Sequence, residues 1–200
     1  NADQKPKVLV VEHWPTGRYL EDEKRAIVNE GEVGFISCLA FWSGVGVTCS
    51  EPERSLEFEF LAKSFPNEEV VYYYFARTVG QWHRLTEKPE LKKYVFPYLE
   101  RDKKTSGWDD SLFTFDHLFD LHMRISGKNF EETEGDYFKQ VSNPTLDLTS
   151  INKIAKSLHD YRNTTIINNV IRYWESGNNI FMVYGNGHIE AHKQELEKRI

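Results

Sequence analysis

The segment Gly185-Asn186-Gly187-His188 contains the residue types best suited to chemistry in this 200-residue chain. An apolar run typical of a buried strand precedes it, and a charged segment typical of a helix follows it. The glycines let the backbone turn sharply and leave His188 at the carboxyl end of a strand, where open α/β sheets bind ligands. The same residues also fit an ordinary turn between a strand and a helix. Neither a dinucleotide-binding fingerprint nor a P-loop is present.

Glu12 ends a second apolar run, which begins at Lys7 and is typical of a buried parallel strand. If the two runs lie side by side in a parallel sheet, Glu12 and His188 emerge at the same edge. A carboxylate and an imidazole placed together are suited to metal binding or to acid/base catalysis. His13 points to the opposite face unless the turn at Pro15 redirects it. Taken alone, a glutamate at the end of a strand is more often a helix cap or a salt-bridge partner.

Arg162 and Asn163 open a segment with the apolar periodicity of a long helix. Arg162 is able to clamp a carboxylate such as Glu12 or a substrate oxyanion, and it is equally compatible with a solvated helix surface. His192 follows His188 at zinc-ligand spacing, but His-Ile-Glu-Ala-His is not the zincin order, so we expect His192 to be solvated. The chain has no nucleophile elbow, which argues against serine hydrolase chemistry.

The amino-acid composition argues against several classes of protein. Asp and Glu number 31 against 25 Lys and Arg, and the resulting net charge of −6 argues against a nucleic-acid partner. The 40% hydrophobic content is enough for a real core, which excludes disordered and collagen-like classes. No run approaches the roughly 20 apolar residues that a transmembrane helix needs.

The cysteines and the first residues of the sequence are compatible with more than one cellular compartment. Cys38 and Cys49 are compatible with one disulfide bond or with two buried thiols, and we favour the thiols because two cysteines make no disulfide framework. A start at Asn1-Ala2, a few residues before a strand, is compatible with an exported protein whose N-terminal signal has been removed.

The pattern of residues predicts an α/β fold with a central, mostly parallel sheet flanked by helices. Residues 7–12 read as a strand, and a helix from about Tyr19 to Asn29 stops at Gly31. Strand material follows at 35–36 and again at 45–49. The order strand, helix, strand is typical of the start of an α/β domain.

The middle of the chain is predicted to be largely helical. Ser50 to Glu53 places a helix cap ahead of Pro52. Residues 68–85 have strand propensity, but an i+3 and i+4 apolar repeat favours a helix. We expect a charged connecting or insert region at 86–107 and an exposed polar segment at 127–143. His117 and His122 are expected to be core or half-buried histidines. The predicted organisation is a single domain over 1–200 with a helical insert at about 86–145. The other expected helices cover about 53–64, 112–125, 146–157, 161–174 and the residues after His188.

Three segments taken in order resemble the motifs of the TraB/PrgY/GumN/TIKI superfamily, which has ChaN-like haem-binding proteins and erythromycin-esterase-like enzymes as distant relatives. The segments are Val8–Glu12, Tyr161–Asn163 and Val183–His188. The resemblance covers roughly residues 7 to 50 and 150 to 195. The Gly-Thr-x-His motif that comes first in the family has no counterpart in this sequence, so the expected site is a reduced one.

The resemblance implies an α/β domain with a site at one sheet edge. Carried over to this sequence, it makes Glu12 and His188 ligands of a divalent metal (Mn, Co or Zn) or acid/base groups, with His13 as a further candidate ligand. Arg162 would orient a carboxylate or the substrate, and Asn163 would support it. Gly185 and Gly187 would form the turn on the cofactor side.

The function expected on this basis is metal-dependent hydrolysis of a peptide or an ester. The alternative is a non-catalytic module that uses the same edge to bind haem, iron, a small ligand or a partner protein. The aromatic surplus at 72–82 and 108–119 fits an apolar pocket or, more simply, a core.

Overall fold

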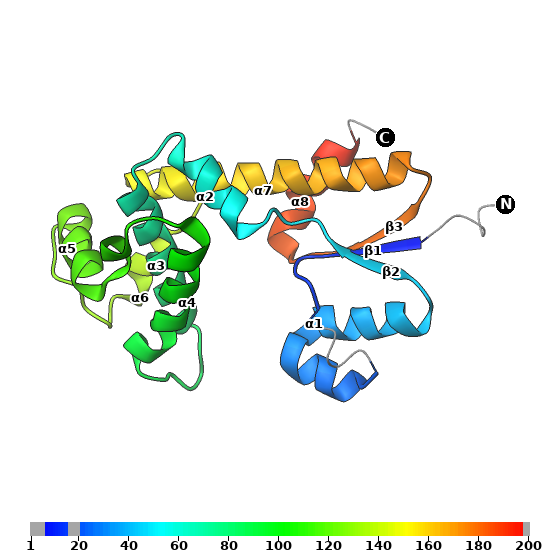
Figure 1. The fold of residues 1–200 in the computed structure, drawn as a ribbon, viewed down its shortest axis with the longest axis horizontal. Coiled ribbons are helices and arrows are strands. Elements are labelled where there is room, and N and C mark those ends of the chain that lie inside the picture. Colours follow the sequence, from blue (N-terminus) through cyan, green and yellow to red (C-terminus); the bar gives the residue numbers. More distant parts are fainter. Residues whose placement is uncertain (1–6, 16–20, 198–200) are drawn as a thin grey trace. The chain divides into compact units, whose positions relative to one another are not determined.

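The computed structural model of this protein describes residues 7–15 and 21–197, and Figure 1 labels its elements. The chain forms two compact units. The first, which we call the sheet unit, comprises Asn1–Pro52 and Tyr161–Ile200. The second, the helical unit, comprises Glu53–Asp160 and so includes the segment expected as a helical insert.

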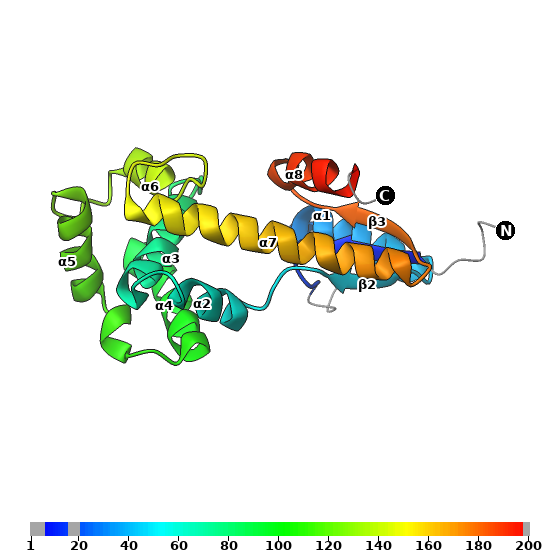
Figure 2. The same ribbon diagram turned by 90° about the horizontal axis from the view of Figure 1, so that it is seen from above.

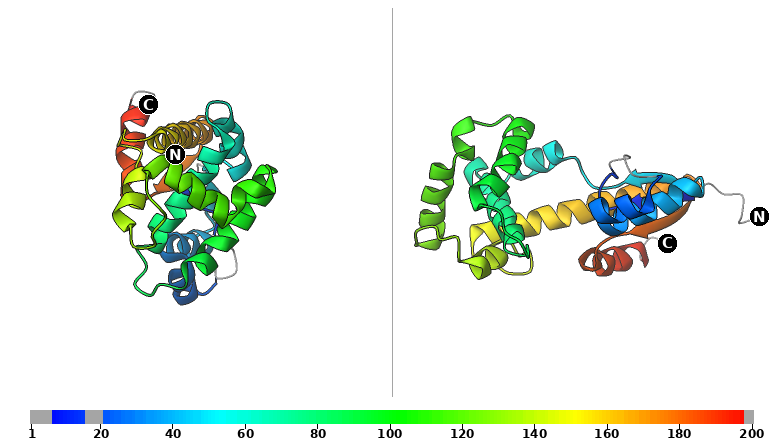
Figure 3. Two further views of the ribbon diagram at one scale, coloured as in Figure 1. Left: turned by 90° about the vertical axis from the view of Figure 1, so that its left-hand side faces the viewer. Right: turned by 90° about the horizontal axis from the view of Figure 1, so that it is seen from below.

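The sheet unit contains a three-stranded parallel sheet in the order β2-β1-β3. Strand β1 spans Lys7–Val11, β2 spans Gly46–Cys49 and β3 spans Asn179–Val183. Helix α1 (Glu23–Trp42) covers one face of the sheet, as Figure 3 (right) shows. The second half of α7 (Ser150–Glu175) and helix α8 (Asn186–Glu197) cover the other face (Figures 1 and 2). The predicted α/β class is therefore confirmed.

Alternation along the strands fills the two faces of the sheet with different cores. Leu9 and Val11 of β1 pack with Val33 and Ala40 of α1. Val10, which points to the opposite face, packs with residues of α7 and with the aromatic ring that follows β3, namely Ile166, Val170 and Tyr184. Because both faces of the central strand are buried, β1 reads as a continuous apolar run in the sequence.

The connections of β1 create a favourable place for a ligand. After β1 the chain forms α1 on one face of the sheet and then β2, which lies on one side of β1. Strand β3 lies on the other side of β1 and follows α7, which covers the opposite face. Open α/β sheets bind ligands outside the carboxyl ends of the strands where the connections diverge in this way. The condition for Glu12 and His188 to emerge at one edge is met, because β1 and β3 are parallel neighbours in the sheet.

Two predictions about the segments that form α1 and α7 are wrong. Phe35 and Ile36 lie in α1 and not in a strand, because helical backbone resumes after Gly31. Gly31 does interrupt the helix, as predicted, since its φ of 58° and ψ of −135° are not helical. The two helices expected at 146–157 and 161–174 are one continuous helix, α7. The predicted helix start at Tyr19 lies outside the described residues.

The helical unit is arranged around α3 (Asn67–Trp82), which confirms the helical interpretation of that segment. Eleven residues of α3 are buried, so its many aromatic side chains are mainly core. Helix α3 contacts several of its neighbours directly, among them α2, α4, α5 and α6. The bounds are Arg54–Ala62 for α2, Leu91–Ser106 for α4, Phe115–Ser126 for α5 and Gly135–Val141 for α6, with a 3₁₀ turn at Asp110–Phe113.

Two segments of the helical unit are partly helical: the expected connecting or insert region at 86–107 and the expected exposed polar segment at 127–143. Helix α4 occupies most of 86–107 and continues through Pro97, because its buried side chains, including Leu91 and Val95, anchor it on α3. Helix α6 lies within 127–143 and buries Phe138 and Val141. In both cases tertiary packing overrides a polar or proline-containing local sequence.

A buried histidine lies in this core. His122 is fully buried, and its Nδ1 lies 2.8 Å from the hydroxyl of Tyr72, which in turn lies 3.1 Å from the hydroxyl of Tyr137. On the other side, Nε2 lies 3.6 Å from a carboxylate oxygen of Glu134. Burial lowers the pKa of His122, against the opposing effect of Glu134.

Mild acid is therefore expected to destabilise the helical unit. The pKa of His122 is lower in the folded protein than the value of about 6.5 in an unfolded chain, so the unfolded chain binds the proton first as the pH falls. The contribution of the neutral imidazole is complete above about pH 6.5 and decreases below it by at most about 1.4 kcal/mol per pH unit. Urea unfolding of the wild type and of His122→Gln, followed by circular dichroism from neutral to mildly acidic pH, measures this dependence. The variant should show a shallower slope, and equal slopes would contradict the assignment.

Candidate metal centre

Three side chains of ligand type meet at the carboxyl edge of the sheet. Glu12 follows β1, Glu51 comes two residues after β2, and His188 lies in the first turn of α8, which follows β3. One potential ligand atom from each residue lies within 4.8 Å of the others, and all three residues are half-buried. The parallel strands thus place two carboxylates and one imidazole close together at the carboxyl edge of the sheet.

Glu12 is held by the turn that precedes α8. The backbone N–H of Gly185 donates to Oε2 of Glu12 over 3.2 Å, while Oε1 lies 3.9 Å from Nε2 of His188. A Cβ atom on residue 185 would lie 3.4 Å from the same carboxylate oxygen, an ordinary van der Waals contact, so this approach does not itself require glycine. Gly187 lies in the first turn of α8.

His188 is oriented by Asn163. Nδ1 of His188 lies 3.0 Å from Oδ1 of Asn163. Because a carbonyl oxygen only accepts hydrogen bonds, Nδ1 is the donor, and in the neutral ring Nε2 then carries the lone pair. Nε2 is the atom that faces Glu12. A histidine whose second nitrogen donates to an oxygen in this way is typical of metal ligands.

Arg162 clamps Glu51. Its Nε and Nη2 each donate to one carboxylate oxygen of Glu51 over 2.8 Å, and both side chains are largely buried, at 15% and 12% exposed. Arg162 thus clamps a carboxylate, as one of its two sequence-based interpretations expected, and that carboxylate is Glu51 at the end of β2, where the sequence suggested Glu12. The bidentate contact takes one lone pair from each oxygen and leaves the others for a further ligand.

Two further protonated groups line this region. Tyr184 is buried, and burial followed by the nearby Glu51 carboxylate raises its pKa, so its hydroxyl keeps its proton at neutral pH. Cys49 ends β2 and donates its thiol to the backbone carbonyl of Glu12 over 3.6 Å. Burial also raises the pKa of Cys49, which makes it a weak nucleophile. Cys49 and Cys38 are both free thiols, as favoured from the sequence.

Two histidines are placed differently from their predictions. His13 is exposed and is not part of the Glu12, Glu51 and His188 cluster, because β1 ends at Val11 and the chain turns away. His192, expected to be solvated, is 4% exposed. Its ring lies 5.4 Å from that of Tyr184 and 5.6 Å from that of His188, since α8 packs this face on the end of β3.

Sequence reasoning missed Glu51 and Tyr184 as members of the site. The signal for Glu51 was present: it follows the 45–49 strand much as Glu12 follows the first strand. The neighbouring Ser50 and Pro52 directed the interpretation toward a helix cap instead. Tyr184 directly follows the apolar run 180–183, and its hydroxyl has no spacing signal.

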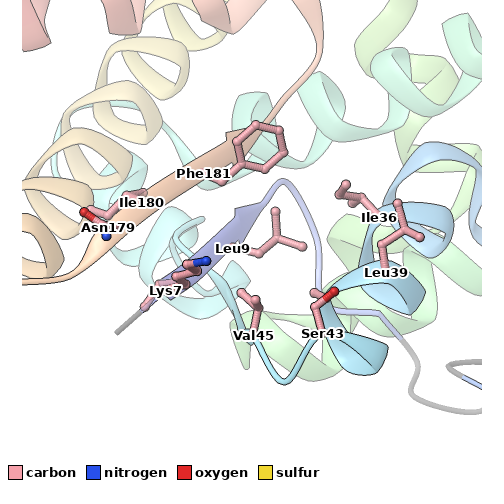
Figure 4. A pocket seen from close by; sticks show the side chains of 11 residues that line it. Lys7, Leu9, Ile36, Leu39, Ser43, Val45, Asn179, Ile180 and Phe181 are labelled. Carbon is pink, nitrogen blue, oxygen red and sulfur yellow. The ribbon is translucent and has the colours of Figure 1, made fainter. Parts of the chain in front are cut away.

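An apolar cavity of about 300 Å³ lies elsewhere in the sheet unit. Figure 4 shows Leu9 and Phe181 of the strands and Ile36 and Leu39 of α1 around it. Lys7 and Asn179, the first residues of β1 and β3, also line it. The cavity therefore belongs to the amino-terminal half of the sheet, opposite the edge that carries the carboxylates.

Fold and site together define an α/β protein with an acidic, histidine-containing cluster at the carboxyl edge of a parallel sheet. No family model, curated protein or solved structure matches the chain. Among the described residues, no helix has both the length and the apolar character that crossing a membrane requires.

Proposed function

We propose that the sheet unit binds a divalent cation through Glu12, Glu51 and His188 and that the protein is a metal-dependent hydrolase of peptide or ester bonds, related to the TraB/PrgY/GumN/TIKI superfamily. One observation carries the proposal: three parallel strands bring three ligand atoms to within 4.8 Å of one another at the edge where such sheets bind ligands.

The donor set fits a catalytic cation. Two carboxylates and one neutral imidazole suit Mn²⁺, Co²⁺ and Zn²⁺, and three protein ligands leave a coordination position for substrate. The carboxylates of Glu12 and Glu51 repel each other at this distance, and a cation removes that repulsion. Asn163 already holds His188 in the tautomer that a cation requires.

The protein groups have separable roles in this mechanism. A cation held here would supply Lewis acidity toward the carbonyl of a peptide or an ester. Arg162 positions Glu51, and its Nε and Nη2 are occupied by that contact, so we assign it orientation of the carboxylate and not capture of an oxyanion. Tyr184, protonated and next to Glu51, is placed to donate a hydrogen bond to developing negative charge.

Metal content measured by mass spectrometry tests the proposal. Protein incubated with Mn²⁺, Co²⁺ or Zn²⁺ and desalted should retain near-stoichiometric metal, and His188→Ala should lose it. His13→Ala is the matched control, because His13 lies next to Glu12 in sequence but outside the cluster. Equal retention by both variants would place the metal elsewhere.

Hydrolysis of fluorogenic peptides and nitrophenyl esters by the metal-loaded protein tests the reaction. Glu12→Ala and His188→Ala should abolish it, and unchanged rates would contradict the mechanism. A Soret band that appears on adding hemin and disappears in His188→Ala, with no retained divalent metal, would instead favour the non-catalytic haem-binding alternative.

A further inference from the structure

The helical unit contains a second site of a different chemical character, a polar cavity of about 210 Å³. Three arginines, two tyrosines and a glutamine are among the residues that line it, and none of its lining residues is acidic. The arginines are Arg54, Arg77 and Arg101; the others are Tyr74, Tyr98 and Gln81. A cavity of this kind offers hydrogen-bond donors and positive charge to whatever enters it.

Three helices build the cavity by regular spacing. Tyr74, Arg77 and Gln81 recur at three- and four-residue intervals on α3, so they share one face of that helix. Tyr98 and Arg101 lie one turn apart on α4, which packs on α3. Arg54 is the first residue of α2 and places its guanidinium over the ring of Tyr74, 3.3 Å from the centroid.

The charges in and around the cavity do not cancel. Arg54 donates to both carboxylate oxygens of Asp102 and to Glu57, and Arg101 also donates to Asp102. Two carboxylates thus neutralise two of the three guanidiniums. Arg77 is half-buried, and its side chain makes no hydrogen bond or ion pair with any residue that the structure describes. One positive charge therefore remains uncompensated, on a side chain that burial would otherwise disfavour.

We propose that this cavity binds a phosphate monoester. Guanidinium groups present planar pairs of N–H donors that match phosphate oxygens. No described partner occupies the N–H donors of the Arg77 guanidinium, so they are available to a phosphate. The hydroxyl of Tyr98 and the amide of Gln81 add neutral donors from two helices. The ion pairs with Asp102 fix the other two guanidiniums in advance, which lowers the entropic cost of ordering them around an anion.

Isothermal titration of the full chain with phenyl phosphate at low ionic strength tests the assignment. Arg77→Gln should weaken binding at least about tenfold, the usual cost of losing a hydrogen-bonded charge. Arg84→Gln, which removes an exposed arginine just beyond α3, is the matched control and should bind like the wild type. Arg77→Lys keeps the charge without the fork and should give an intermediate affinity.

Three results would overturn the proposal. The first is that the wild type does not bind phenyl phosphate at millimolar concentration. The second is that Arg77→Gln and Arg84→Gln weaken binding equally, as unspecific charge attraction requires. Benzoate binding as tightly as phenyl phosphate would show a general carboxylate site instead. Circular dichroism of each variant establishes that it is folded, and because Arg77 has no described partner its replacement breaks no ion pair of the described fold.

Discussion

Glu51→Gln is expected to bind Co²⁺ about 100-fold more weakly than the wild type, although the sequence alone gave Glu51 no role. The magnitude follows from zinc sites of four ligands, whose total binding free energy of about 10–16 kcal/mol corresponds to roughly two decades of affinity per ligand. The structural basis is the position of Glu51 within 4.8 Å of Glu12 and His188. Titration of the visible absorption of Co²⁺ measures the affinity.

Glu51 also holds Arg162, so its two roles have to be separated. Arg162→Gln removes the clamp but keeps the carboxylate, and it should weaken Co²⁺ binding less than Glu51→Gln does. Glu32→Gln, an exposed glutamate on α1, controls for the change in net charge. If folded Glu51→Gln binds Co²⁺ as the wild type does, Glu51 serves only to hold Arg162, and the three-ligand centre is wrong.

The fold class was predictable because a strand that is buried on both faces, as β1 is, has a recognisable apolar sequence. Residues 8–11 are a continuous apolar run, which is what a parallel strand covered on both faces requires. Residues 180–183 have the same pattern, although β3 is an edge strand that leaves Phe181 61% exposed. Glycine and aromatic residues around Phe35 gave a misleading local signal, because strand propensity at two positions does not outweigh a helix that buries Val33 and Ala40 on the sheet.

The candidate site was predictable only where it depends on strand ends. Glu12 and His188 each follow a recognisable strand, so their convergence required only that the strands be neighbours. The partner of Arg162 depends on which strand end faces α7, a tertiary relation without sequence periodicity. The burial of His192 likewise depends on how α8 packs on Tyr184, which local composition does not encode.

Asp102→Ala is expected to destabilise the helical unit by about 3 kcal/mol, near the lower end of the range for breaking a buried ion pair. Asp102 is 3% exposed and accepts four hydrogen bonds, two from Arg54 of α2 and two from Arg101 of its own helix α4. The estimate stays near the lower end because Arg54 is 25% exposed and keeps Glu57 as a partner. Urea unfolding followed by far-ultraviolet circular dichroism measures the change.

The control is Asp110→Ala, which removes a carboxylate that is 81% exposed and lies 3.6 Å from Lys103. Its loss should change the free energy of unfolding by less than about 0.5 kcal/mol, as for other exposed ion pairs. If the two variants lower the free energy of unfolding by similar amounts, the burial of Asp102 does not increase its contribution to stability.

A triple variant separates the value of the ion pairs from the cost of an unpaired charge. In Asp102→Ala, Arg54 loses its α4 partner while it stays packed against the rings of Tyr74 and Phe58. Because Arg54 also pairs with the buried carboxylate of Glu57, all three residues are replaced together, as Arg54→Met, Asp102→Leu and Glu57→Gln. The triple variant should be more stable than Asp102→Ala, because buried ion pairs replaced by uncharged side chains of similar volume often leave the stability unchanged. If the triple variant is instead less stable than Asp102→Ala, the ion pairs themselves stabilise the α2–α4 contact, and the low net value expected of buried pairs does not hold here.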